Sequence, residues 1–166
     1  MKNITLITCS CLAILLGIGK VNAQIGAKKE HDARVERLLD TIGLKYQIDS
    51  DGDFTLTNQL DSGRTQLFWV NSNTERYNIM EIREVWSIAY ISEGLVSSTI
   101  MRTLLKDNGS KKLGSWKLTT DKGKECVVFY AQIAANSDKN AFLGALQLVS
   151  QAADEMEKQL TGKDDL

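Results

Sequence analysis

Three aspartates at alternate positions, Asp49, Asp51 and Asp53, have the spacing that most favours metal chemistry in this chain. Hard cations such as Ca²⁺ prefer several carboxylate oxygens close together. An EF-hand loop counted from Asp49 would need glycine at position 54 and glutamate at position 60, but the sequence has Phe54 and Leu60 there. Asp and Gly in series are also typical of a tight turn. We therefore interpret the cluster as a turn, and a looser ion site stays open.

The chain offers few other groups for metal binding or nucleophilic catalysis. Its single histidine, His31, lies among charged residues, where we expect a solvated side chain, and it is far in sequence from Cys126. A zinc site normally needs several Cys or His ligands. No glycine-rich phosphate loop follows a predicted strand. We expect no enzymatic activity, no catalytic residues, no bound metal and no cofactor.

Four aromatic residues, Trp69, Trp86, Tyr90 and Trp116, are the candidates for partner binding. Each falls in a run that predicts a strand, and aromatic side chains are enriched at protein interfaces. Ordinary burial statistics favour core packing for such rings, so a peptide-binding surface is the functional alternative. Cys126 begins the apolar run CVVF, which predicts a buried thiol.

The first 23 residues predict a cleaved secretory leader. Lys2 precedes an apolar run over 4–18, and small residues lead up to Ala23. The run is shorter than the roughly 20 residues that span a bilayer. We therefore expect no stable membrane anchor, a mature chain that begins at Gln24, and export to the periplasm or the extracellular space.

The mature chain, residues 24–166, is expected to form a single domain with its core at about 28–160. Its length is close to the commonest domain size, and the sequence contains no proline that could build a proline-rich linker. The formal net charge of the full 166-residue sequence is −1, and no basic run is longer than pairs such as Lys111-Lys112. We therefore expect no nucleic-acid partner.

Three segments show the three-and-four spacing of amphipathic helices. The first helix is expected to end at Gly43, with an apolar stripe of Val35, Leu38, Leu39 and Ile42. The second is expected to begin at a cap at Ser97 or Ser98 and to stop at Asn108-Gly109, with a stripe of Ile100, Met101, Leu104 and Leu105. The third is expected to begin at a cap at Ser137, with a stripe of Phe142, Ala145, Leu146, Val149, Ala153, Met156 and Leu160.

Alternating apolar residues predict strands at 45–49, 53–57, 66–71, 80–91, 116–119 and 125–133. The predicted turns lie at 50–52, 71–73 and 121–123. In the fourth strand, the expected core side consists of Met80, Ile82, Trp86, Ile88 and Tyr90. Glu84 falls on that side, so we expect a bulge there or a later start.

These elements predict an α+β fold. The expected architecture is an antiparallel sheet of five to six strands with three helices, in the order α-β(3-4)-α-β-β-α. The last strand run is apolar on both sides, which indicates a strand covered on both faces.

Residues 35–54, VERLLDTIGLKYQIDSDGDF, resemble the opening of YbjN-domain proteins, in which a helix ending near glycine leads into a hairpin with an acidic Asp-Gly-Asp turn. The later element order is similar to the layout that this family shares with type III secretion chaperones. The resemblance implies a non-enzymatic protein, a protein partner held in extended form, and a homodimer as in some of these chaperones. Familiar members act in the cytoplasm, whereas the predicted leader exports this chain.

The leading functional hypothesis is therefore an exported protein-binding module, with a chaperone-like or regulatory role. The alternatives are a periplasmic small-ligand or ion-binding protein and a hydrolase with unrecognised carboxylates. An exposed apolar patch would favour the first, an enclosed pocket the second, and a cleft carboxylate with a raised pKa the third.

Overall fold

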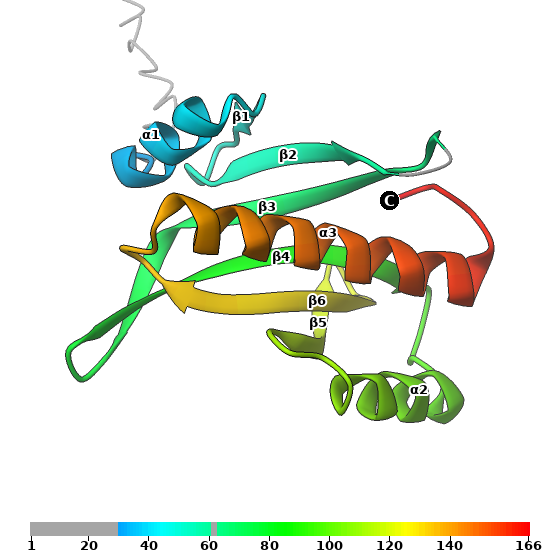
Figure 1. The fold of residues 1–166 in the computed structure, drawn as a ribbon. Coiled ribbons are helices and arrows are strands. Elements are labelled where there is room, and N and C mark those ends of the chain that lie inside the picture. The colour runs from blue at the N-terminus through cyan, green and yellow to red at the C-terminus, as the bar shows by residue number, and fades with distance from the viewer. Residues whose placement is uncertain (1–29, 61–62) are drawn as a thin grey trace, which may run out of the picture.

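The structure, a computed structural model, describes residues 30–60 and 63–166. The predicted leader and its cleavage site before Gln24 lie outside the described residues. Three helices and six strands occur in the predicted order (Figure 1). Their bounds are α1 Ala33–Ile42, β1 Gln47–Ile48, β2 Phe54–Gln59, β3 Thr65–Tyr77, β4 Met80–Ser92, α2 Ser98–Asn108, β5 Ser115–Asp121, β6 Lys124–Ala134 and α3 Lys139–Thr161.

The strands form one open antiparallel sheet in the order β1-β2-β3-β4-β6-β5. The first four strands follow one another along the chain. After β4, the connection through α2 places β5 at the far edge of the sheet and not beside β4. The chain then returns as β6, which fills the position between β4 and β5. The predicted α+β class and element order are confirmed.

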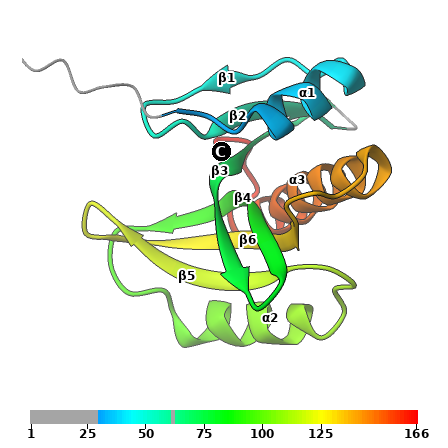
Figure 2. The ribbon, with the colours of Figure 1, turned by 90° about the vertical axis from the view of Figure 1, so that its left-hand side faces the viewer.

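Helix α3 lies across one side of the sheet, and no helix among the described residues covers the opposite side of β3, β4 and β6 (Figures 1 and 2). An apolar stripe of α3 that includes Phe142, Leu146, Val149 and Ala153 is buried against the sheet. Helix α1 buries Val35 and Leu39 in the same core. The part of the chain that the structure describes therefore has a two-layer arrangement with one face of the sheet left open.

From Met80 to Ile88, before the register shift, the side of β4 that meets the core is the reverse of the predicted one. Arg83, Val85, Ser87 and Ala89 are buried, whereas the larger apolar residues on the other side are only half-buried or exposed. Helix α3 crosses directly over β4 (Figure 1). A helix that packs this closely accommodates small side chains, and the wide rings are left on the open face.

The predicted turn at 71–73 was wrong, because β3 continues through these residues to Tyr77. The register between β3 and β4 shifts between Val70 and Thr74, which marks a bulge, and the hairpin turns at Asn78 and Ile79. Asn78 has a φ of 54°, a left-handed conformation that asparagine tolerates well. The irregularity expected at Glu84 lies opposite it, because the extra residues between the pairs Val70–Val85 and Thr74–Arg83 belong to β3. The alternative of a later start was wrong, since β4 begins at Met80, and a second register shift lies between Ile88 and Tyr90.

Side-chain caps begin all three helices. Asp32 caps α1 and Ser97 caps α2, but Asp138 caps α3 in place of the predicted Ser137. The Ser137 hydroxyl instead donates to the Ala134 carbonyl. Gly43 ends α1 as predicted, with a φ of 81° that favours glycine.

His31 and Cys126 are both less exposed than a typical surface residue. His31 is half-buried rather than solvated, since it lies 3.0 Å from the Glu36 carboxylate and edge-on to the Phe54 ring. Cys126 is buried and unpaired, as predicted for its apolar run. None of the helices in the described part of the chain is long and apolar enough to cross a membrane.

Candidate functional site

The open side of the sheet, here called the helix-free face, is the candidate functional site. Neighbouring residues on a strand point to opposite sides of a sheet, and paired residues on adjacent strands share a side. The strand registers therefore assign to this face a set of side chains that includes Gln47, Thr55, Thr57, Leu67, Trp69, Glu84, Trp86, Ile88, Lys117, Val128, Tyr130 and Gln132. They come from all six strands.

Trp69 and Trp86 form the centre of the helix-free face. They are direct cross-strand partners in β3 and β4, and their rings stack at a centroid distance of 4.3 Å with an interplanar angle of 9°. Both side chains are half-buried although no helix of the described residues covers them. Rings stacked at this distance cover each other's inner faces, so the pair, here called the aromatic platform, presents ring edges and outer faces of the kind that protein interfaces use to bury apolar surface.

The bulge in β3 holds Trp86 in place. The indole N–H of Trp86 donates to the Asn71 side-chain oxygen at 2.7 Å, and Asn71 is the first bulge residue. Ser72, the next residue, donates its backbone N–H to the Asp53 carboxylate and its hydroxyl to the Gly52 carbonyl. The turn between β1 and β2 therefore fixes the bulge, and the bulge orients the indole.

Arg83 supports the same bulge from the core side. Its side chain is 1% exposed, and its guanidinium donates to the backbone carbonyls of Asn71 and Ser72. The other end of the guanidinium pairs with the Asp32 carboxylate at 2.5 Å. A buried arginine is stable only when its donors are satisfied. These contacts link the start of α1 to the strand that carries the platform.

Arg34 extends this network to the surface. It donates to both Asp32 and Glu81, at 2.6 Å and 2.7 Å for the shortest contacts. Burial by itself raises the pKa of Asp32, but the hydrogen bonds from Arg34 and Arg83 outweigh burial and hold that pKa well below its ordinary value. The hydrogen bonds from Arg34 and Thr74 lower the pKa of Glu81 to about 2. Both carboxyls are therefore ionised at neutral pH.

A polar border lies beside the tryptophans on β5 and β6. The Lys117 ammonium sits 4.2 Å from the centre of the Tyr130 ring and 3.2 Å from the Glu84 carboxylate. Gln132 donates to the same carboxylate at 3.4 Å. The helix-free face therefore combines an aromatic centre with charged and amide groups that could bond to a polypeptide backbone.

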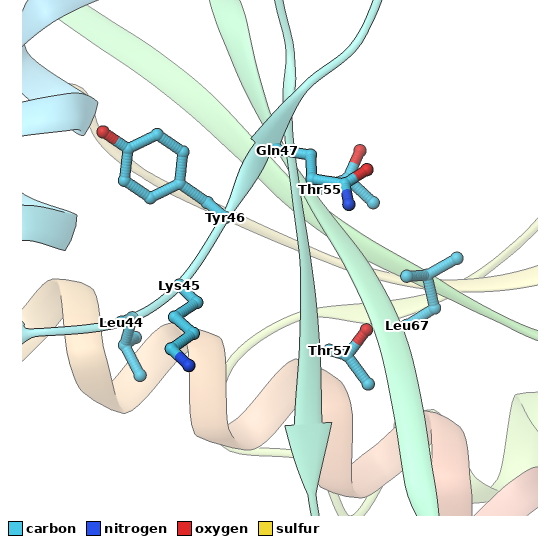
Figure 3. A pocket seen from close by; sticks show the side chains of 7 residues that line it. All are labelled: Leu44, Lys45, Tyr46, Gln47, Thr55, Thr57 and Leu67. Carbon is cyan, nitrogen blue, oxygen red and sulfur yellow. The ribbon is translucent and has the colours of Figure 1, made fainter.

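Two depressions flank the platform. One of about 260 Å³ is lined by Asp53, Asn71, Glu84, Trp86, Lys117, Thr119 and Val128. The other, of about 760 Å³, lies at the edge formed by β1, β2 and β3 and is lined by Leu44, Lys45, Tyr46, Gln47, Thr55, Thr57 and Leu67. Figure 3 shows the side chains of Gln47 and Thr55 close together in this second depression, and the Tyr46 ring directed away from them. Lys45, Gln47 and Thr57 are exposed, so the depression is open to solvent.

The four predicted partner-binding residues do not share one face. Trp69 and Trp86 lie together on the helix-free face, but Trp116 pairs with Phe129 and is 7% exposed on the opposite side. Tyr90 pairs with Val127 after the register shift in β4, which turns it to the core side as well. Tyr130 and Lys117, which the sequence reasoning missed, join the tryptophans instead.

The aspartate cluster caps a turn. One oxygen of Asp49 accepts the backbone N–H groups of Asp51 and Asp53, and Gly52 has a φ of 82°. These are the contacts expected of the turn interpretation.

A second group of carboxylates lies at the far end of the molecule. Asp154, Glu157 and Asp164 lie within one cluster, and the Arg64 guanidinium contacts all three, at 2.5 Å for Asp154. Burial raises the pKa of Glu157, whose carboxylate also accepts the backbone N–H groups of Asp165 and Leu166. The cluster therefore fastens the C-terminal segment to α3.

No family model and no curated protein matches this sequence. The solved structures that are similar to this chain include two described here. One is a chain of the heterodimeric complex ExoU-SpcU from the type III secretion system of Pseudomonas aeruginosa, with 20% identity and a TM-score of 0.42, covering 78% of this chain and 99% of that chain. The other is YbjN from E. coli, with 10% identity and a TM-score of 0.45, covering 77% and 89%. Because both TM-scores are below 0.5, membership of either family stays a prediction.

Proposed function

We propose that this protein is an exported, non-enzymatic binding module that holds a segment of another polypeptide on its helix-free face. The observation that carries the proposal is the Trp69–Trp86 stack, which is half-buried on a side of the sheet that no described helix covers. A network of buried charge supports this platform, so its geometry is set before any partner binds. A preorganised surface loses less conformational entropy on binding.

An extended segment fits this face better than a folded domain does. The platform is bordered by Lys117, Glu84 and Gln132, whose charged and amide groups match backbone carbonyls and N–H groups. Depressions on both sides of the tryptophans leave room for side chains of the segment. Aromatic centres with polar borders are typical of protein interfaces.

A small-ligand carrier is the less well supported alternative. Pockets for small molecules enclose most of the ligand surface. The depression of about 760 Å³ has a suitable volume, but exposed residues such as Lys45 and Gln47 form its walls. A small molecule there would remain largely in contact with water.

Tryptophan fluorescence offers a direct test, because the chain has three tryptophans and one lies away from the face. In a Trp116→Phe background, emission comes from Trp69 and Trp86 alone. Proteins captured from a periplasmic extract on the tagged mature chain would be identified, and peptides covering their sequences would be titrated. We expect a peptide to shift the emission. Anisotropy of the same peptide carrying a fluorescent label should show that its affinity is lost when Trp69 and Trp86 are both changed to alanine.

The matched control is Tyr77→Ala, because Tyr77 is an aromatic residue 69% exposed at the tip of the β3–β4 hairpin. Circular dichroism would check that each variant is folded. Peptide binding that persists in the folded double alanine variant, or that is lost equally in Tyr77→Ala, would contradict the proposal.

A further inference from the structure

The outward side of α2 is a second surface with unusual chemistry. Met101 and Leu105 are one helical turn apart and 38% and 71% exposed, while Ile100 and Leu104 face the core. The predicted single apolar stripe is therefore two stripes, only one of which is covered. Large aliphatic side chains exposed on a helix more often mark a contact surface when they are neighbours.

The inward side of α2 is firmly attached. Asp107 accepts the indole N–H of Trp116 at 2.6 Å, and Asn108 accepts the backbone N–H of the same residue at 2.6 Å. Leu104 is buried in the core. The outward residues are thus presented on a fixed scaffold and cannot turn inward to bury their apolar surface.

The charges beside the exposed stripe are all positive. Arg102 and Lys106 are exposed and one turn apart, on the same outward side as Leu105. In the part of the chain that the structure describes, neither forms an ion pair. The one acidic residue of α2, Asp107, faces inward and is engaged by Trp116 and Lys111. The outward surface of α2 therefore has an apolar ridge beside two positive charges that form no ion pair with a described acidic side chain.

We propose that the outward side of α2 docks an acidic amphipathic helix of a partner protein. A ridge of residues four apart packs into the groove of a second helix. Charges that flank such a ridge select partners of opposite sign. Leucine or a similar residue of the partner would cover Met101 and Leu105, and its glutamates or aspartates would pair with Arg102 and Lys106. This surface is separate from the helix-free face and does not depend on the function proposed for it.

Two other occupants fit the same surface less well. In a two-fold dimer the same patch meets itself, so Arg102 and Lys106 would face their own copies and repel. Helices that lie in a membrane interface have a broad apolar face that often includes aromatic residues. The exposed stripe of α2 has two aliphatic residues and no aromatic residue.

The test uses two labelled synthetic helical peptides that share one leucine stripe. The stripe is flanked by glutamates in the acidic peptide and by lysines in the basic peptide. Fluorescence anisotropy would follow their binding to the full mature chain at low and high salt. We expect the acidic peptide to bind, its affinity to fall with added salt, and the basic peptide to bind at least about tenfold more weakly.

Three variants separate this proposal from its alternatives. Arg102→Glu/Lys106→Glu should reverse the preference in favour of the basic peptide, and Leu105→Ser should weaken binding of both peptides. Lys139→Glu/Lys158→Glu makes the same charge change on α3 and should leave binding unchanged. All the changed side chains are exposed, so the fold should persist, which circular dichroism would check.

Several results would overturn the proposal. These are equal affinity for the two peptides, no binding of the acidic peptide, and an unchanged preference in the double α2 variant. Binding to anionic lipid vesicles without binding to the acidic peptide would assign the surface to a membrane. A dimer that dissociates in Leu105→Ser would assign it to a second copy of the chain.

Discussion

Arg83 is the residue on which the geometry of the helix-free face depends most. We expect Arg83→Met to lower the free energy of unfolding by about 3 to 5 kcal/mol, because Asp32 keeps only Arg34 of its two arginine partners, and two backbone carbonyls lose the buried guanidinium that donates to them. Urea denaturation followed by circular dichroism measures the change. Arg76→Met is the matched control, since Arg76 is exposed on the same hairpin. Equal stability of the two variants would show that the buried network is not needed.

The carboxyls of the same network make stability depend on pH. The pKa of Asp32 is held below its ordinary 3.8, and that of Glu81 is about 2 against 4.5. A carboxyl with a lowered folded pKa stabilises the fold above its unfolded pKa, and this stabilisation is lost as the pH falls through the folded pKa. We therefore expect their contribution to the free energy of unfolding to decline from about pH 5 toward about pH 2.

The comparison of wild type with Glu81→Gln isolates this effect from the other titrating groups. Denaturation midpoints measured between pH 7 and pH 3 should differ most at neutral pH and converge as the pH falls. Glu157 acts in the opposite sense, because burial raises its pKa. A constant difference between the two proteins across the range would mean that Glu81 contributes no ionic stabilisation.

Cys126 should react slowly with thiol reagents in the native protein. The side chain is 3% exposed, and burial raises the pKa of its thiol, so little thiolate is available. Labelling with a maleimide, followed by mass spectrometry, should be slow in buffer and fast in denaturant. Rapid native labelling, or a disulfide-linked dimer on a non-reducing gel, would contradict this expectation.

At the scale of elements, α3 supplies the helical layer over the centre of the sheet. Leu146 is 2% exposed in its buried stripe, and we expect Leu146→Ala to cost about 2 to 5 kcal/mol of unfolding free energy. Leu105→Ala removes the same atoms from a side chain that is 71% exposed, so it should have little effect. Thermal and urea denaturation compare the two variants. Similar midpoints would mean that α3 packs loosely on the sheet.

The β3–β4 hairpin shows that the Trp69–Trp86 pair could not be predicted once the turn had been placed at the wrong residues. With a turn at 71–73, Trp69 and Trp86 would not have been cross-strand partners. The hairpin turns at Asn78, and the bulge shifts the register so that the two rings meet. The polar run at 71–73 has the composition of a turn. Its backbone can remain in a strand because Arg83, Asp53 and Gly52 bond to it from distant parts of the chain.

At the scale of the whole molecule, export remains a prediction with a direct test. The leader should be removed between Ala23 and Gln24, because small residues follow an apolar run too short to span a bilayer. Intact mass spectrometry of the chain recovered from the periplasm or medium should give a mass that begins at Gln24. A membrane-bound form that retains Met1 would contradict export as a soluble module.

The amino-acid sequence by itself determined the order of helices and strands, the end of α1 at Gly43, both ends of α2, and the burial of Cys126. These features depend on local periodicity, caps and turn residues, which lie within a few positions of one another. The α+β class follows from that order.

Only the tertiary structure decided which side of β4 meets the core and which aromatic rings gather on one face. The sequence favours burying the larger side chains of β4, but the close approach of α3 accepts Val85, Ser87 and Ala89 and leaves Trp86 outside. Buried Arg83 depends on Asp32, which lies 51 positions away in the chain. Contacts at such separations depend on how the layers pack, and no local pattern of residue types encodes them.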